Sequence, residues 1–190
     1  MARHDPAVSS AEDVRASLKA AFVWRGDRTD DSFRADITGW WRDAALLEAL
    51  GPALAGLVSP FEPTVVLGLQ SRGVMLGALV AMELDLGLIE VRKDPGPAAA
   101  SDAWLARTTP PDYRDRHLSL GFRRDLLKAG ERAVLVDDWI ETGGQALASQ
   151  GLVEAAGGTW CGAAVIVDGL TDSRVRRQLQ LQSLLHVREL

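Results

Sequence analysis

The residues best suited to chemistry lie in the stretch 133–146. Two adjacent carboxylates, Asp137 and Asp138, end an apolar run, and a Thr-Gly-Gly turn follows at 142–144. Unpaired backbone N–H groups in a glycine-rich turn that opens a helix can hold a phosphate, because the helix dipole adds partial positive charge there. Carboxylates accept hydrogen bonds from sugar hydroxyls or hold a hydrated Mg²⁺. The combination predicts a sugar-phosphate site, whereas each part alone would indicate only a strand end and a helix cap.

Strands and helices that alternate along the sequence would position this stretch. We expect strands at 64–69, 86–91, 132–136, 160–167 and 184–187, and helices at 73–83, 144–156 and 171–179. Such alternation indicates an α/β fold with a mainly parallel, twisted sheet flanked by helices on both faces. Ligands of such sheets bind at the carboxyl ends of the strands, which is where Asp137 and Asp138 stand.

The N-terminal region is expected to be helical. Ser9 and Glu12 have the spacing of a capping box, which predicts a helix at 11–22. Helical patterning resumes over 40–58, with a break at Gly51-Pro52.

The region 93–118 is irregular: it is rich in Pro, Ala and Thr and lacks periodicity. A connection of this length in a compact domain is usually a functional loop or a disordered insertion. Its flanking strands favour a mobile lid at 94–117 over the active site.

The stretch 133–146 resembles the signature with which type I phosphoribosyltransferases bind 5-phosphoribosyl-1-pyrophosphate (PRPP): an apolar run, two acidic residues, two apolar residues, any residue and Thr-Gly. The resemblance implies the fold of that family, with N-terminal helices and a hood-like segment at 1–60 and a PRPP-binding core at 61–190. It also implies that Asp137 and Asp138 hold the ribose. The 5′-phosphate loop would consist of Glu141, Thr142, Gly143, Gly144 and Gln145.

The stretch 66–77 looks like the pyrophosphate loop of adenine phosphoribosyltransferases, in which a Gly-hydrophobic-Asp-Ser-Arg-Gly turn opens a helix. Gln70 replaces the Asp here. The resemblance implies that the pyrophosphate is held by this loop, with Arg72 as a charge-assisted fork. Lys93 stands where the family ends its next strand with an Arg-Lys pair, so it is either a further contact or a solvated strand end. The predicted pyrophosphate site is Gln70, Ser71, Arg72, Gly73 and Lys93.

Two departures from the family bear on catalysis. The family carries Ser-Leu-Glu-Tyr-Gly after its flexible loop, with the Glu implicated in proton transfer, and Gly121 stands at that place here. Glu141 occupies the position of an Asp in hypoxanthine-guanine enzymes, so we expect it to accept the proton of the base beside the catalytic pair Asp137 and Asp138. Otherwise Glu141 faces solvent or the phosphate loop, and the base loses its proton to water. Gln145 replaces a hydroxyl residue, and its amide can still donate to the 5′-phosphate.

The base pocket is predicted from three residues. Trp139 stands where the family packs an aliphatic residue on the base, so it stacks on the base or is buried between sheet and helix. Arg34 belongs to a segment, 32–38, that is similar to the family's base-binding hood. Asp168 ends the strand where oxopurine enzymes use a Lys, which favours a base with an amino group unless Asp168 caps the next helix. Three further aromatic residues could line the pocket or pack in the core: Trp24, Trp40 and Trp41.

Composition limits the partners. The 190 residues carry a formal net charge of −5 and a pI near 5.2, whereas nucleic acids and membrane surfaces are usually bound by basic faces. Cys161 is the single cysteine, which predicts a reducing compartment. The first residues lack the apolar core of a signal peptide, and no clean apolar stretch reaches the roughly 18 residues of a membrane span. We predict a cytoplasmic protein with no nucleic-acid or membrane partner.

These observations predict a Mg²⁺-dependent phosphoribosyltransferase of purine salvage. It would transfer the 5-phosphoribosyl group from PRPP to a nucleobase, with adenine favoured among the purines, and yield a nucleoside monophosphate and pyrophosphate. The resemblance also implies a homodimer. The rival hypothesis is a non-catalytic PRPP- or nucleotide-binding regulatory protein on the same fold, because loss of the family Glu and the change at Gln145 are what such a history would leave.

Overall fold

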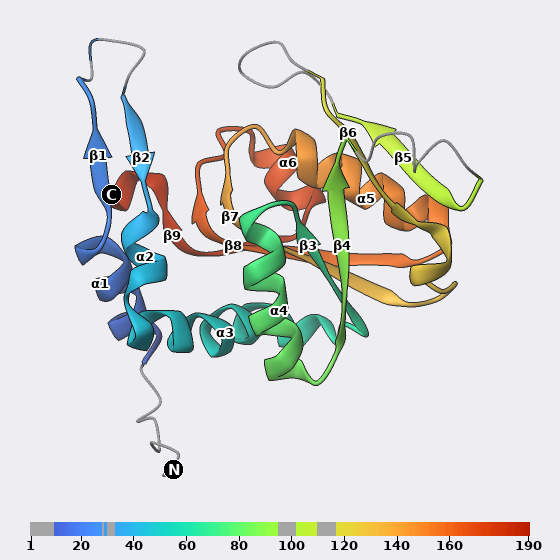
Figure 1. Ribbon diagram of the computed structural model, residues 1–190, viewed down its shortest axis with the longest axis horizontal. Helices are drawn as coiled ribbons and strands as arrows, with labels where there is room; N and C mark the ends of the chain where they lie inside the picture. Colours follow the sequence, from blue (N-terminus) through green and yellow to red (C-terminus); the bar gives the residue numbers. More distant parts are fainter. Residues whose placement is uncertain (1–9, 28, 30–32, 95–101, 110–116) are drawn as a thin grey trace.

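The structure is a computed structural model that describes residues 10–27, 29, 33–94, 102–109 and 117–190. Its centre is a seven-stranded sheet (Figure 1). The strands are β3 (Val65–Leu69), β4 (Gly87–Lys93), β5 (Trp104–Thr108), β6 (Ser119–Arg123), β7 (Arg132–Ile140), β8 (Thr159–Asp168) and β9 (Leu181–His186). They lie side by side in the order β5-β6-β4-β3-β7-β8-β9.

Five neighbouring strands, β4-β3-β7-β8-β9, run parallel, which confirms the predicted α/β class. The β6 strand joins the edge of β4 in the antiparallel direction, and β5 pairs with β6 in the same way. Neither was predicted, and β5 lies inside the stretch expected to be a loop at 94–117. Two parts of that stretch, 95–101 and 110–116, lie outside the described residues, so the predicted lid stays a prediction.

Helices cover both faces of the sheet, because side chains of the central strands alternate between two apolar layers. Val66 of β3 packs with α1 (Ala11–Ala20), α3 (Ala44–Val58) and α4 (Arg72–Leu84). Leu67 packs with α5 (Gly144–Ala156) on the opposite face, where α6 (Ser173–Gln178) also contributes Val175. The bounds of two elements differ from the prediction. The helix expected at 171–179 begins two residues later, at Ser173, and the last strand begins at Leu181 instead of residue 184.

The predicted break at Gly51-Pro52 is wrong, because α3 continues through both residues. A proline inside a helix costs about 3 kcal/mol, but Leu50, Leu54 and Val58 are fully buried on this helix, and each contributes about 1.5–3 kcal/mol. Gly51 also lies against α4, since a Cβ there would come within 3.3 Å of the Leu79 carbonyl oxygen. Tertiary packing therefore outweighs the local signal.

The most apolar helical segment of the described chain is Ala44–Phe61, which comprises α3 and a short 3₁₀ turn (Ser59–Phe61). By length and composition alone it is apolar enough to cross a membrane. Its buried side chains pack on α4 and on β8 and β9 instead. We interpret α3 as a core helix.

The N-terminal helix α1 begins at Ala11, as predicted, but its N-cap lies one residue later than expected. Ser10 is the N-cap, its hydroxyl accepts from the Asp13 N–H at 3.2 Å, and Asp13 accepts from the Ser10 N–H at 3.0 Å. The capping box was therefore expected one position too early, at Ser9 and Glu12, and the helix ends at Ala20 instead of residue 22. Ser9 lies outside the described residues.

A two-stranded hairpin rises beside the carboxyl edge of the sheet, separate from it (Figure 1). It consists of β1 (Val23–Arg25) and β2 (Arg34–Asp36), and α2 (Thr38–Arg42) follows it. Asp36 pairs with Arg25 and accepts from the Thr38 N–H at 3.0 Å. The bonds from Thr38 and then Arg25 lower the pKa of Asp36. We call the described residues of 23–42 the hood.

Candidate active site

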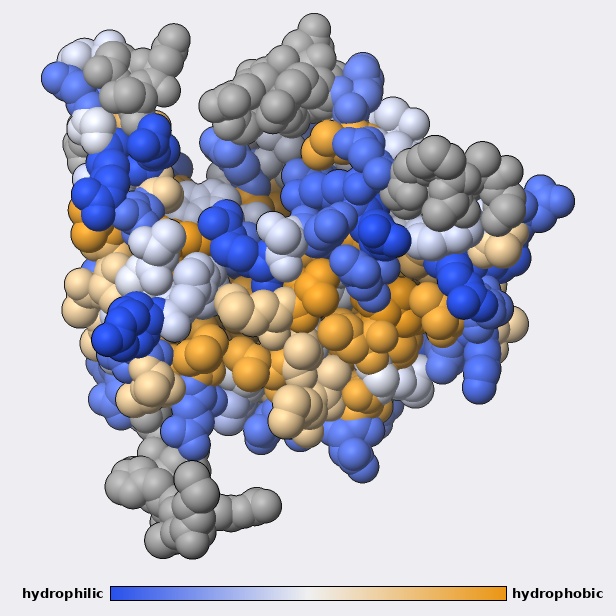
Figure 2. Space-filling view, viewed as in Figure 1, coloured by the Kyte–Doolittle hydropathy of each residue, from blue (hydrophilic) through white to orange (hydrophobic). Residues whose placement is uncertain are grey.

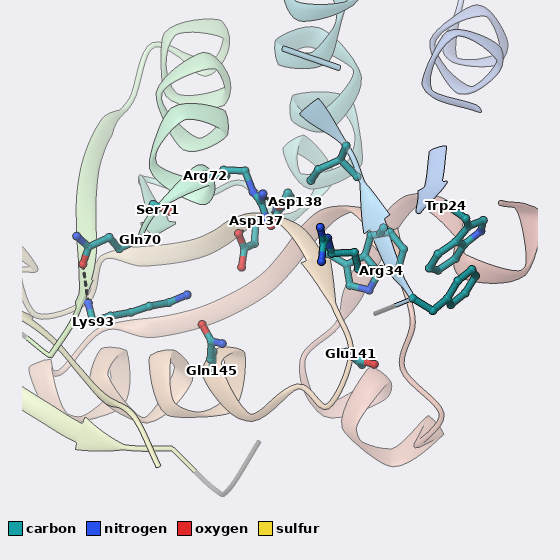
Figure 3. Close-up of a pocket in the computed structure, with 14 residues that line it drawn as sticks. Trp24, Arg34, Gln70, Ser71, Arg72, Lys93, Asp137, Asp138, Glu141 and Gln145 are labelled. Carbon is teal, nitrogen blue, oxygen red and sulfur yellow. Dashed lines mark hydrogen bonds and ion pairs between the residues drawn. The ribbon is translucent and has the colours of Figure 1, made fainter. Parts of the chain in front are cut away.

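A pocket of about 510 Å³ lies between the hood and the carboxyl edge of the sheet (Figures 2 and 3). Its floor is formed by Gln70, Ser71, Arg72, Lys93, Asp137, Asp138 and Gln145. Its other wall is formed by Trp24, Phe33, Arg34, Ala35 and Ile37 of the hood, and Trp139 and Glu141 join the two. Most side chains that the sequence placed in the site are therefore brought together.

The end of β7 supplies the two carboxylates. Asp138 is 6% exposed, and its Oδ2 pairs with Nε of Arg72 at 2.5 Å. The Asp138 N–H donates to Oδ1 of Asp137 at 2.9 Å. Burial, followed by the adjacent Asp138 charge, raises the pKa of Asp137 well above the ordinary aspartate value, while the Lys93 charge opposes the rise. The two carboxyl groups can accept hydrogen bonds from a ligand or bind a cation that accompanies it.

The turn after β7 forms a second pocket of about 290 Å³, which shares five lining residues with the first: Lys93, Asp137, Trp139, Glu141 and Gln145. Gly143 has φ +79°, and a Cβ there would lie 2.7 Å from a Val175 methyl, so both conformation and space require glycine. Within the described residues no side chain bonds the N-cap position of α5, Gly143, and the Gly144 N–H that begins the helix donates to the Thr142 hydroxyl at 3.4 Å. The further amides of such a helix start are offered to an anion.

Gln145 lies at this helix start, with its side chain at the boundary of the two pockets. Its Oε1 is buried and has no hydrogen-bond partner within the described protein. Buried polar atoms are rarely left unpaired. The arrangement therefore suits a ligand that completes the hydrogen bonding of this amide.

The turn between β3 and α4 brings a cation to the floor. Arg72 is the first residue of α4, and the Gln70–Ser71 peptide bond before it is cis. Gly73 does not line the pocket, but a Cβ there would lie 2.7 Å from the Val136 carbonyl oxygen and 2.8 Å from Oδ1 of Asp137. Glycine is what lets the start of α4 approach the carboxylates so closely.

The hood contributes aromatic rings. Trp24 stacks on Phe33 with ring centroids 4.6 Å apart, and it meets Trp139 edge-on at 6.4 Å. Arg34 extends from β2 into the pocket (Figure 3). Sequence reasoning identified the segment 32–38 but missed Phe33 as a lining residue, because three-residue strands leave too short a pattern to show which side chains face inward.

Some candidate residues lie elsewhere. Asp168, predicted for the base pocket, does not line it: Arg176 donates to both of its oxygens, at 2.7 and 3.2 Å, and the Leu170 N–H donates to Oδ1 at 2.8 Å. The side chain that caps the next helix is Asp172. Trp40 is fully buried, and its Nε1–H donates to the Leu18 carbonyl at 2.9 Å, so it is a core residue.

Known proteins are similar to this chain in sequence and in fold. No protein-family model matches the chain. An adenine phosphoribosyltransferase of Synechococcus (strain ATCC 27144) is 38% identical over 117 residues, a match that spans 60% of this chain and 64% of the relative's length. The adenine phosphoribosyltransferase of Methylococcus capsulatus is 35% identical over 80% of this chain and 86% of its own. The chain belongs to the adenine phosphoribosyltransferase family.

A solved structure agrees with this assignment. The crystal structure of adenine phosphoribosyltransferase from Thermoanaerobacter pseudethanolicus has a TM-score of 0.79 and 26% identity over 90% of this chain and 99% of that one. The predicted type I phosphoribosyltransferase fold is thereby confirmed. Within it, Gly121, which replaces the Glu expected of adenine phosphoribosyltransferases, lies in mid-β6 opposite Arg92 and Ala106.

The resemblance to phosphoribosyltransferases implies a divalent cation, and the carboxylates of the pocket can be tested for a fit to one. Within the described residues no three His, Cys, Asp or Glu side chains cluster to form a protein-only metal site. Asp137 and Asp138 are adjacent carboxylates beside an open pocket. Mg²⁺ typically keeps several waters and binds through one or two carboxylates together with substrate phosphates. The two side chains fit that mode of binding.

Proposed function

We propose that the chain transfers the 5-phosphoribosyl group from PRPP to adenine, with release of pyrophosphate. The observation that carries this proposal is the convergence of three devices on one pocket edge. These are the Asp137–Asp138 pair, the start of α5, and the cations Arg72 and Lys93. Their chemistry matches the ribose, the 5′-phosphate and the pyrophosphate of one substrate.

Each group of PRPP is assigned to a part of the floor. The 5′-phosphate would occupy the second pocket, against the amides of 142–145, and Glu141 lies at its rim. The ribose hydroxyls would donate to Asp137 and Asp138. The pyrophosphate would bind to the cations Arg72 and Lys93, which both line the first pocket.

Catalysis would then rest on position and charge. As the bond from C1 to the pyrophosphate breaks, positive charge develops on the ribose beside the carboxylates of Asp137 and Asp138. Arg72 stabilises the negative charge that accumulates on the leaving group. Mg²⁺ bound with PRPP would neutralise further charge on these oxygens.

The base would enter between the hood and Trp139. Stacking of the base on the rings of Trp24, Phe33 or Trp139 suits a planar purine, and Arg34 and Glu141 offer a donor and an acceptor to its edge. Glu141 is exposed at the junction of the two pockets. It would accept the proton that the attacking nitrogen of adenine releases, the role left open by Gly121.

We also propose that the protein is a homodimer that acts in purine salvage in the cytoplasm. Met75 and Met82 of α4 and Leu88 of β4 are exposed, Met82 by 81%. Figure 2 shows apolar side chains gathered on the face that carries these elements. An exposed apolar patch of this kind favours association with a second copy. Sedimentation measurements of the molecular mass would test it.

A panel of bases tests the activity. The protein is incubated with PRPP, Mg²⁺ and adenine, guanine or hypoxanthine, and pyrophosphate release is measured. Release with adenine alone supports the proposal. Binding of PRPP without turnover on any base would support the regulatory alternative, which the glycine at position 121 favours.

A further inference from the structure

The carboxyl ends of β3 and β4 are joined by an irregular hydrogen bond. The ladder between the two strands is regular up to Leu69 and Val91, and the Gln70 N–H continues it to the Val91 carbonyl at 2.9 Å. In a regular parallel ladder the next bond would run from the Lys93 N–H to the main-chain carbonyl of Gln70. Here the Lys93 N–H donates instead to the side-chain Oε1 of Gln70, at 2.8 Å (Figure 3).

The side-chain acceptor replaces the main-chain one at the point where both strands, β3 and β4, leave the sheet. After Gln70 the backbone turns toward α4, so its own carbonyl no longer continues the ladder. Lys93 is the last residue of β4, and Asp94 after it has φ +42°. The Gln70 side chain therefore adds one hydrogen bond to the sheet and fixes the backbone of the residue that carries the Lys93 ammonium group.

Lys93 is the residue that benefits. It lines both pockets, and its charge acts on Asp137. The carboxamide of Gln70 is directed toward the Lys93 backbone and not toward Asp137 (Figure 3). The oxygen of Gln70 is thus committed to the protein, although the side chain lies at the edge of the pocket.

We propose that Gln70 is a positioning residue that holds the end of β4 so that Lys93 faces the pyrophosphate of PRPP. The proposal rests on the proposed function. It replaces a direct contact between the Gln70 carboxamide and the pyrophosphate by an effect transmitted through the Lys93 backbone. The predicted consequence is that Gln70 matters for PRPP only while Lys93 is present.

A double-mutant cycle tests this dependence. Gln70→Met keeps the length of the side chain and removes the acceptor. Loss of one hydrogen bond of this kind should raise KM for PRPP about tenfold, with kcat and KM for adenine nearly unchanged. In the background of Lys93→Met the same change should have no effect on KM for PRPP. Additive effects of the two substitutions would overturn the proposal.

Amide hydrogen exchange measured by NMR tests the hydrogen bond without any turnover. The Lys93 amide should be protected in the wild type and in Gln70→Glu, which keeps an acceptor oxygen, and should exchange faster in Gln70→Met. Unchanged protection in Gln70→Met would overturn the proposal. If Gln70→Met does not fold, absence of Lys93 protection in the wild type or in Gln70→Glu would overturn it equally.

Gln150→Met is the matched control, since Gln150 bonds Gln178 on the exposed surface, where α5 and α6 meet. It should leave KM for PRPP and the exchange of Lys93 unchanged. A wild-type protein that shows no PRPP-dependent turnover would refute the proposed function, while the exchange data would still show whether Gln70 holds Lys93.

Discussion

The floor and the hood are built by different means. The floor consists of turns at the ends of adjacent parallel strands, so its residues are fixed by the ladder, by buried carboxylates and by glycines that admit no side chain at positions 73 and 143. The hood is a separate hairpin held by the Arg25–Asp36 ion pair and by packing of aromatic rings such as Trp24 on Phe33. The comparison suggests that the floor sets the chemistry on PRPP and the hood selects the base.

The largest effect is expected on the floor. Arg72→Ala removes a charge from the proposed pyrophosphate site and leaves Asp138 buried without its ion-pair partner. We expect kcat/KM for PRPP to fall about a thousandfold, roughly 4 kcal/mol. Steady-state kinetics with Arg177→Ala, an exposed arginine of α6, as control would measure it. A rise in KM for adenine with normal PRPP kinetics would break the division between floor and hood.

The next effect concerns Glu141, which joins the two regions. Glu141→Gln preserves shape and removes the proton acceptor, so kcat should fall about a hundredfold while both KM values stay the same. The variant would be compared with the wild type by steady-state kinetics over a range of pH. Unchanged turnover would show that the base loses its proton to water.

A smaller effect is expected in the hood. Trp24→Leu removes an aromatic ring from the pocket wall, and because stacking of a base contributes about 1–3 kcal/mol, KM for adenine should rise about tenfold. KM for PRPP should not change. Trp104→Leu, on β5 beside Arg92, is the matched control. Equal effects of Trp24→Leu on both substrates would mean that the hood also shapes the PRPP site.

The smallest effect is on stability. Because the folded protein raises the pKa of Asp137 above 3.8, it binds this proton more tightly than the unfolded chain. The free energy of unfolding should therefore fall as pH rises from about 4 through the pKa in the folded state. Asp137→Asn should reduce this loss and stabilise the protein at neutral pH by about 1 kcal/mol. Denaturant titrations without PRPP or Mg²⁺ at several pH values would test the sign, and a destabilised variant would contradict it.

The same contrast explains what could be predicted from the sequence. The β7 strand, its turn and α5 are contiguous and carry their signals locally, so Asp137, Gly143 and Gln145 could be assigned before the structure. The hairpin strands have only three residues each, and β5 and β6 join the edge of the sheet through partners distant in sequence. Pro52 inside α3 and the engagement of Asp168 by Arg176 likewise depend on tertiary contacts that no local pattern contains.

The α4 helix links the interior of the site to the outer surface. At one end a Cβ on Gly73 would lie 2.8 Å from Oδ1 of Asp137, and near the other end Met82 is 81% exposed. A helix of 13 residues transmits a displacement along its axis with little bending. A partner that shifted α4 on covering the methionine end would alter the spacing around Asp137, and association at the surface and affinity for PRPP would then be thermodynamically linked.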